Sequence, residues 1–244
     1  MVEQLAELLR AQQPCVVLTG AGVSTESGIP DFRSAGGIWA TYDPMEVASI
    51  DGFRRDPQLV WEFYARRLAI LDGAEPNDGH RALARLEELG LVRAVVTQNV
   101  DGLHQRAGSR EVVEVHGTIR GAVCLDCGRR EGFERVLELL PLPRCACGAV
   151  LKPAVVMFGE LLPAEAIERA TELAAAARLL LVVGSSLEVH PVAGLPFDTL
   201  RRGGTLAIVN RGPTALDEHA ELRLDGSAGE LLAATVALLE QDEE

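Results

Sequence analysis

Four cysteines occur as two close pairs within one stretch of the 244-residue chain. Cys124 and Cys127 are separated by two residues, and Cys145 and Cys147 by one. Each pair can bind one metal ion from a tight turn, and two such turns make a tetrahedral cage of four thiolates. Because the protein supplies all four ligands, no position remains for water or substrate. The pattern therefore predicts a structural zinc site rather than a catalytic one.

Disulfides and simple core packing are the alternatives for these cysteines. Disulfides are rare in cytoplasmic proteins, and we expect a cytoplasmic location because the N-terminal residues lack a basic segment followed by an apolar one. The segment between the pairs is too polar and broken to bury four thiols for packing alone. The fifth cysteine, Cys15, lies in an apolar run and is expected to be a small core residue.

Glycines end a short apolar run near the N-terminus. Residues 15–19 are typical of a buried strand, and Gly20-Ala21-Gly22 follows them directly. Glycine has no Cβ, so backbone N–H groups can approach a ligand closely there. A helix that begins near Ser24 would point its N-terminal N–H groups at the same place, a combination that binds phosphate. Two glycines in such a turn also occur for steric reasons alone, so this motif needs support from the rest of the chain.

Apolar runs alternate with amphipathic stretches along most of the chain. Strands are predicted at 15–19, 92–97, 111–115, 179–183 and 205–209, and helices at 2–9, 55–71, 77–89, 163–177 and 229–239. Residues 28–45 are expected to form a long loop, and residues 118–154 an irregular segment. Strands that alternate with helices imply a parallel sheet covered on both faces. The predicted fold class is therefore α/β.

Polar or glycine-rich residues follow four of the predicted strands. They are Gly20-Ala21-Gly22, Gln98-Asn99-Val100-Asp101, Gly184-Ser185-Ser186 and Asn210. Ligands bind at the carboxyl ends of the strands in a parallel sheet. The first turn lacks the spacing Gly-x-Gly-x-x-Gly, and no acidic residue ends a second strand about 20 residues later. The sequence therefore predicts a variant dinucleotide site, in which Asn210 can hold a ribose.

Composition narrows the classes of function. The formal net charge of −13 disfavours a broad nucleic-acid surface, which needs clustered cations. No apolar run approaches the roughly 20 residues of a membrane helix. Lys152 is the only lysine, and every other cationic residue is an arginine.

In combination these motifs resemble the sirtuin family, the NAD-dependent protein-lysine deacylases. The matching stretches follow the family's order over almost the whole chain: Gly20-Ala21-Gly22-Val23-Ser24, Gly28-Ile29-Pro30-Asp31-Phe32-Arg33, Thr97-Gln98-Asn99-Val100-Asp101-Gly102-Leu103-His104, His116-Gly117, the two cysteine pairs, Phe158-Gly159-Glu160, Gly184-Ser185-Ser186-Leu187 and Asn210. The resemblance implies a Rossmann-like parallel sheet with a small zinc-binding module and a helical insert.

The resemblance also implies two domains. A Rossmann-like, NAD-binding large domain would comprise residues 1–31, 76–117 and 155–244. The small domain would combine a helical and cofactor-loop part, residues 32–75, with the zinc-binding module, residues 118–154. NAD and the acyl-lysine peptide would meet in the cleft between the domains.

By the same resemblance, the strand ends and the loop after the first turn would hold NAD. The cofactor-binding residues it implies are Gly20, Ala21, Gly22, Ser24, Asp31, Phe32, Arg33, Gln98, Asn99, Asp101, Gly184, Ser185, Ser186, Asn210 and Ala228. The segment from Val155 to Glu160 would pair with the substrate backbone as an added strand. Its expected substrate-binding residues are Val156, Phe158, Gly159 and Glu160.

His116 is the expected general base, because histidine can accept a proton near neutral pH. In the family's reaction the acyl oxygen of the modified lysine attacks the ribose and expels nicotinamide, and the base then activates a ribose hydroxyl. The implied products are free lysine, nicotinamide and O-acyl-ADP-ribose. Without the surrounding motifs, His116 would be interpreted as an ordinary histidine at a strand end. The other four histidines, His80, His104, His190 and His219, are expected to have no catalytic role.

Tyr64 and Arg67 are three residues apart in a predicted helix and therefore share one face. A phenol and a guanidinium together can bind a carboxylate. The pair resembles that of sirtuins that remove succinyl or malonyl groups, whereas the alternative is a solvated arginine beside a half-buried tyrosine. The predicted activity is therefore deacetylation together with desuccinylation or demalonylation.

Two other functions remain open from the sequence. One is a mono-ADP-ribosyltransferase on the same scaffold, and the other is a noncatalytic, NAD-sensing interaction protein. His116 and the pair of Tyr64 and Arg67 favour deacylation. The expected partners are acylated lysine-containing proteins or peptides, with no direct nucleic-acid or membrane partner, and the oligomeric state stays open.

Overall fold

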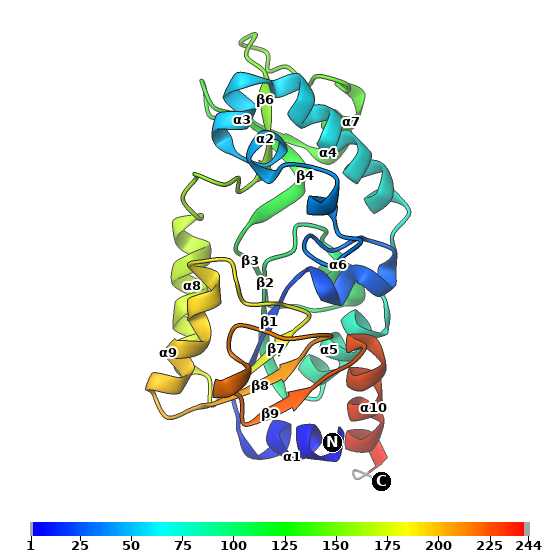
Figure 1. Cartoon of the computed structure of the whole chain (residues 1–244), viewed down its shortest axis with the longest axis vertical. Coiled ribbons are helices and arrows are strands. Elements are labelled where there is room, and N and C mark those ends of the chain that lie inside the picture. Colours follow the sequence, from blue (N-terminus) through cyan, green and yellow to red (C-terminus); the bar gives the residue numbers. More distant parts are fainter. Residues whose placement is uncertain (1, 242–244) are drawn as a thin grey trace.

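A parallel six-stranded sheet forms the centre of the larger part of the molecule (Figure 1). The computed structural model describes residues 2–241. In spatial order the strands are β3 (Val112–Glu114), β2 (Val92–Thr97), β1 (Cys15–Thr19), β7 (Leu179–Val183), β8 (Thr205–Val209) and β9 (Leu222–Leu224). The five predicted strands are confirmed, as is the α/β fold class. The sixth, β9, has only three residues, and Arg223 at its centre conceals its strand character.

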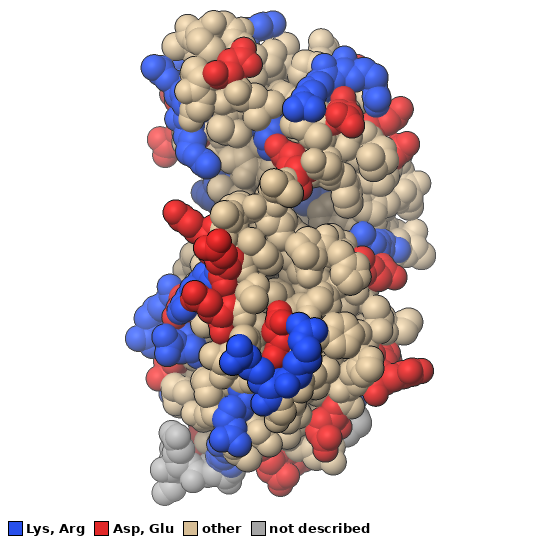
Figure 2. All heavy atoms as spheres, turned by 90° about the vertical axis from the view of Figure 1, so that its left-hand side faces the viewer, with Lys and Arg blue, Asp and Glu red and all other residues tan. Residues whose placement is uncertain are grey.

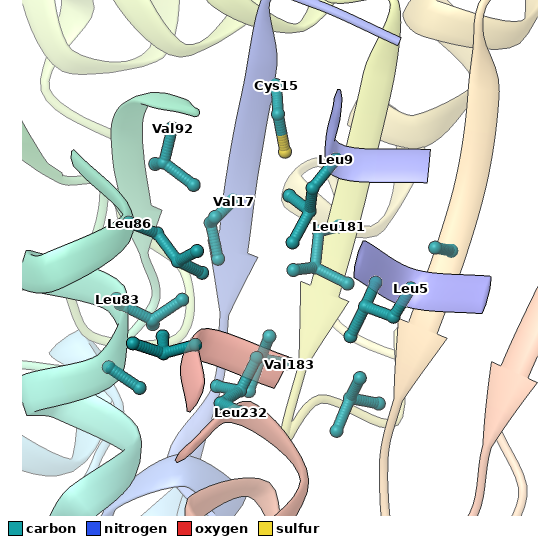
Figure 3. Packing of buried hydrophobic residues seen from close by; sticks show 14 of the residues in the cluster. Leu5, Leu9, Cys15, Val17, Leu83, Leu86, Val92, Leu181, Val183 and Leu232 are labelled. Carbon is teal, nitrogen blue, oxygen red and sulfur yellow. The ribbon is translucent and has the colours of Figure 1, made fainter. Parts of the chain in front are cut away.

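Helices cover both faces of this sheet. Helices α1 (Val2–Ala11), α5 (Asp78–Glu88) and α10 (Ala228–Gln241) contribute to the hydrophobic cluster on one face, and α8 (Ala164–Ala176) and α9 (Leu195–Arg201) to the cluster on the other. Figure 3 shows Val17 of β1 and Leu181 of β7 packed with Leu83 and Leu5 of the first set. Successive strand residues point to opposite faces, which is why β1 is a continuous apolar run.

The predicted helix over residues 77–89 is confirmed, and Asn77 caps its N-terminus. The Asn77 side chain accepts hydrogen bonds from the backbone N–H groups of Gly79 and His80, at 2.9 and 3.2 Å. Gly90, just after the helix, has φ +73°, the left-handed conformation that glycine adopts without strain. Within residues 2–241, no helix has the length and apolar character that crossing a membrane would require.

The prediction of an irregular segment over residues 118–154 is wrong. This region contains parts of a three-stranded antiparallel sheet, in the order β5-β4-β6, together with helix α7 (Phe133–Glu138). Its strands are β4 (Gly117–Cys124), β5 (Arg130–Gly132) and β6 (Leu151–Val155). Glycines and Pro153 interrupt the alternation of apolar and polar residues that would predict these strands. Some of the apolar residues that pack on the sheet come from a helix that is distant in the sequence. The indole of Trp61, for example, donates to the carbonyl of Leu151 at 2.7 Å.

Three helices pack beside this smaller sheet, near the top of Figure 1. They are α2 (Pro44–Val47), α3 (Ile50–Arg55) and α4 (Pro57–Asp72). Helix α4 confirms the helix predicted at 55–71, and it begins two residues later because the Asp56 carboxylate caps the N–H of Leu59 at 3.0 Å. The predicted loop at 28–45 contains a 3-10 turn at Ile38–Ala40 and the start of α2. A short helix, α6 (Leu103–Ala107), follows the polar residues at the end of β2.

Candidate functional site

A large cleft lies between the six-stranded sheet and the smaller sheet with its helices. Its volume is about 1210 Å³, above the roughly 300–1,000 Å³ of an ordinary small-molecule pocket. All 22 residues predicted to be catalytic, cofactor-binding or substrate-binding line this one cleft. On the side of the molecule drawn in Figure 2, the surface is hollowed between its upper and lower parts, and acidic and basic side chains are interspersed.

Glycines let two strand ends meet at the floor of the cleft. The N–H of Gly22 donates to the carbonyl of Gly184 at 2.8 Å, and a Cβ at Gly22 would lie 2.8 Å from the same oxygen. Gly184 has φ +61°, and a Cβ there would lie 2.3 Å from the nitrogen of Val23. Neither position can carry a side chain without moving backbone. The floor of the cleft is therefore built from backbone, and it suits a ligand that approaches N–H groups closely.

The helix predicted to start near Ser24 begins earlier and is of a different type. A 3-10 helix, Ala21–Ser27, follows Gly20 directly, so Ser24 lies within it and does not cap it. The Ser24 hydroxyl points inward and donates to the carboxylate of Asp101 at 2.8 Å. It also accepts from the side-chain amide of Asn99 at 3.0 Å. Ser24 thus fixes the two polar side chains at the end of β2.

A buried layer of threonines and histidines supports these polar side chains. The hydroxyl of Thr19 donates to that of Thr97 at 2.8 Å, and the N–H of Asn99 donates to Thr97 at 3.0 Å. The Nε2 atom of His104 lies 2.9 Å from Thr19. Since the Thr19 proton is already used, His104 is the donor in this contact. Sequence reasoning missed this layer, because Thr19 and His104 are 85 residues apart.

The second buried histidine, His80, packs against His104 with ring centroids 4.8 Å apart. Its Nδ1 atom accepts from the N–H of Asn77 at 3.3 Å, and its Nε2 atom lies 3.4 Å from the Ser24 hydroxyl. Burial lowers the pKa of His80 to about 4 and that of His104 to about 3. Both rings are therefore neutral at neutral pH. In the sequence, the position of His80 is indicated by its spacing of three residues from Asn77, which is the spacing of a capping box.

His116 directly precedes β4 and lies on the wall of the cleft. Its Nδ1 atom is 3.1 Å from the carbonyl oxygen of Gln98. A carbonyl can only accept, so Nδ1 carries the proton and Nε2 keeps its lone pair. Burial lowers the pKa of His116 below its ordinary value, while the bond to Gln98 acts in the opposite direction. The ring is therefore a neutral base with one nitrogen available.

Further polar residues connect the remaining strand ends. The side-chain amide of Gln98 donates to the Ser185 hydroxyl at 2.9 Å, which joins the ends of β2 and β7. Asn210 directs its amide to the carbonyls of Arg211 and Gly212, at 3.1 and 3.0 Å. On the loop after the first turn, Asp31 accepts from the N–H groups of Arg33 and Ser34.

Tyr64 and Arg67 lie three residues apart on α4, the spacing that predicted a shared face, and both line the cleft. The Arg67 guanidinium lies over the ring of Phe32, 5.0 Å from its centroid. Burial lowers the pKa of Arg67 and raises that of Tyr64. Within the described part of the chain, neither side chain has a hydrogen-bond or ion-pair partner. A partly desolvated cation and a phenol are thus left together on the cleft wall.

The segment after β6 lines the cleft, but it is not a free strand. The N–H of Phe158 donates to Ala48 at 2.9 Å, and its carbonyl accepts from Ile50 at 3.0 Å. One side of the segment is therefore paired within the chain. The N–H of Val156 donates to the carbonyl of His116 at 2.8 Å, which ties this segment to the predicted base.

The four paired cysteines lie together on the smaller sheet and outside the cleft. Their sulfur atoms are all within 4.8 Å of one another, and no disulfide joins them. Cys124 and Cys147 are 3.5 Å apart, and Cys127 and Cys145 are 3.6 Å apart. Zn–S bonds of about 2.3 Å in a tetrahedron place the sulfurs about 3.8 Å apart. The cluster therefore fits a zinc ion bound by four thiolates, as predicted.

Known proteins match the chain in sequence and in structure. The model of the Sir2 family matches residues 20–191. The NAD-dependent protein deacylase 2 of Pyrobaculum aerophilum is 48% identical over 95% of this chain and 93% of its own. A Sir2 homologue in complex with NAD superimposes with a TM-score of 0.93 at 41% identity, covering 99% of this chain and 95% of its own. A Sir2 protein with a deacetylated p53 peptide and 3′-O-acetyl ADP-ribose superimposes with a TM-score of 0.92 at 40% identity, covering 97% of both chains.

The family model covers more than half of the chain, and the relatives match almost all of it. The four-cysteine cluster agrees with the zinc-binding module that the sirtuin resemblance implied. The chain belongs to the Sir2 family.

Proposed function

We propose that this protein is an NAD-dependent protein-lysine deacylase. The supporting observation is that His116, with its free Nε2 atom, shares one cleft with the polar strand ends and with the segment after β6. A noncatalytic sensor would need no such base. The relatives named above, an NAD-dependent deacylase among them, support the same activity.

NAD would occupy the part of the cleft formed by the strand ends. The backbone around Gly20, Gly22 and Gly184 would approach its diphosphate, because side chains are excluded there. Gln98, Asn99 and Asp101 would hold the nicotinamide ribose and carboxamide, and Ser185, Ser186, Asn210 and Ala228 the adenosine half. Asp31, Phe32 and Arg33 would close over the diphosphate and nicotinamide. Bound NAD supplies the ribose to which the acyl group is transferred.

His116 would act as the general base in this reaction. Its neutral ring accepts a proton at Nε2, while Nδ1 keeps the ring oriented through the carbonyl of Gln98. Ser24 and the buried layer behind it would hold Asn99 and Asp101 in place without taking part in proton transfer. The lowered pKa values of the buried His80 and His104, about 4 and about 3, make them poor proton acceptors near neutral pH, whereas His116 has a free Nε2 atom in the cleft.

The acylated peptide would enter from the side of the smaller sheet and lie along Val156, Phe158, Gly159 and Glu160. We also propose that Tyr64 and Arg67 bind a carboxylate at the end of the acyl chain. Arg67 forms no direct ion pair within the described chain, although the Asp101 carboxylate acts on it from a distance, so a succinyl or malonyl group would supply a directly bound anion. The division into two domains follows from this arrangement. Residues 1–31, 76–117 and 155–244 would bind NAD, and residues 32–75 and 118–154 would form the small domain with its structural zinc.

The activity is tested by product analysis. The enzyme is incubated with NAD and an acetyl-lysine peptide, and nicotinamide, deacylated peptide and O-acetyl-ADP-ribose are measured by mass spectrometry. We expect the three in equal amounts, with a fall of about 10²–10⁴-fold in His116→Ala. His219→Ala is the matched control, because His219 is exposed and lies outside the cleft. If ADP-ribose becomes attached to protein and no O-acetyl-ADP-ribose forms, the protein is a mono-ADP-ribosyltransferase. If NAD binds and no product forms, the protein is a noncatalytic NAD sensor.

A further inference from the structure

The only lysine of the chain is buried behind the segment that faces the peptide side of the cleft. Lys152 lies on β6 and is 4% exposed. Its ammonium group donates to the carbonyls of Pro153 and Val155, at 2.9 and 2.7 Å. The third bond goes to the carboxylate of Glu160, also at 2.9 Å. An ammonium group has three donors, so the hydrogen-bonding capacity of Lys152 is fully used.

Glu160 extends this contact to the middle of the segment. The carboxylate oxygen that binds Lys152 also accepts from the N–H of Met157 at 2.9 Å. In return, the N–H of Glu160 donates to the carbonyl of Met157 at 3.0 Å. Residues 157–160 are thereby closed into a turn, in which Gly159 takes φ +89°. Lys152 thus contacts the turn through the carboxylate of Glu160.

These bonds leave a small set of backbone groups available to a ligand. Phe158 uses both of its backbone groups on Ala48 and Ile50, and the N–H of Val156 is bonded to His116. Between Val156 and Gly159, only the carbonyl of Val156 and the two backbone groups of Gly159 lack a partner in the described chain. Both residues line the cleft. They are the groups that a peptide backbone can pair with.

We propose that Lys152 is a positioning residue for the substrate peptide. It holds the carbonyl of Val155 and the carboxylate of Glu160 on the inner side of the segment, so that Val156 and Gly159 present their free backbone groups to the cleft. This inference rests on the proposed deacylase function.

The choice of lysine at this position has a chemical reason. Every other cationic side chain of the protein is an arginine. The planar fork of a guanidinium group suits two parallel acceptors, whereas an ammonium group suits three acceptors around one point. Three acceptors surround residue 152. We therefore expect Lys152→Arg to disturb the turn although it keeps the charge.

The test compares two substrates that share one reacting group. One is an acetyl-lysine peptide, and the other is a single acetyl-lysine with blocked ends, which has no flanking residues to pair with the protein. In Lys152→Met we expect the ratio of their kcat/KM values, peptide over single residue, to fall about tenfold through a raised peptide KM. NAD affinity, measured by calorimetry, stays unchanged. Arg130→Met, an exposed cation on the same small sheet, is the matched control and keeps the ratio.

Specific outcomes overturn the inference. An unchanged ratio in Lys152→Met overturns it, even if both rates fall, because a merely structural role would affect both substrates alike. If Lys152→Met does not fold, the double variant Lys152→Met/Glu160→Gln takes its place, because it removes both charges and so leaves no buried charge without a partner. An unchanged ratio in the double variant would also overturn the inference. Inactivity of the wild type on both substrates would overturn the proposed function and this inference with it.

Discussion

The Nδ1 atom of His116 lies 3.1 Å from the carbonyl oxygen of Gln98, an acceptor that requires Nδ1 to carry the proton. The contact joins the predicted base to the end of β2, the strand end from which Asn99 and Asp101 also extend. One backbone carbonyl therefore sets both the tautomer of the base and its position relative to the proposed NAD site.

The first prediction concerns the pH dependence of the reaction. His116 must be neutral to accept a proton, so kcat/KM falls as the pH falls through its pKa. Burial lowers this pKa below the ordinary value of 6.5. We expect the acidic limb of the pH profile for kcat/KM to have its midpoint below 6.5. A midpoint above that value would contradict the environment described for His116.

The second prediction concerns the acyl group. Tyr64→Phe/Arg67→Met removes the phenol and the guanidinium, and each charge-assisted bond lost costs about 1.5–3 kcal/mol. We expect kcat/KM for a succinyl-lysine peptide to fall about 100-fold, with the value for the acetyl peptide changed less than about threefold. Arg66→Met is the matched control, because Arg66 is an exposed neighbour that binds Tyr42. Equal losses on the two peptides would rule out the proposed carboxylate contact.

The third prediction concerns zinc. Cys124→Ala leaves three thiolates, and binding of a structural metal is coupled to folding. We expect zinc to be lost on dialysis and the melting temperature to fall by about 10 °C or more, since ~1 kcal/mol corresponds to roughly 2–4 °C in a protein of this size. Cys15→Ala should retain zinc, because Cys15 lies in the core of the large sheet. Zinc content is measured by mass spectrometry and stability by thermal unfolding. Full zinc occupancy in Cys124→Ala would exclude a zinc site built from these four cysteines.

The fourth prediction concerns the accessibility of Lys152. Its amine is buried and donates all its hydrogens to protein acceptors. We expect acetic anhydride to leave Lys152 unmodified in the folded protein and to acetylate it after denaturation, as read by peptide mapping. Modification at similar rates in both states would show that the amine is exposed.

The smaller sheet shows where local patterns fail. Its strands are interrupted by glycines and by Pro153, and they are partly covered by Trp61 from a helix about 90 positions earlier in the chain. Such a stretch does not show the alternation of apolar and polar residues that is typical of a strand, because packing against another element can bury residues on either side of it. The four cysteines were predictable nevertheless, since ligand pairs for one metal ion must lie close in sequence to share a turn.

The sequence by itself determined the parallel sheet, the cap at Asn77, the cysteine cage and the meeting of polar strand ends at one edge. The cap and the cage depend on residue types within a few positions of one another, and the sheet with its shared edge follows from the alternation of apolar strands and helices along the chain. Only the tertiary structure decided that Thr19 meets His104, that Gln98 contacts His116, and that Lys152 pairs with Glu160 in the segment after β6. Each of these contacts joins side chains or backbone groups that the packing of separate elements brings together, and buried polar groups are stable only once that packing supplies their partners.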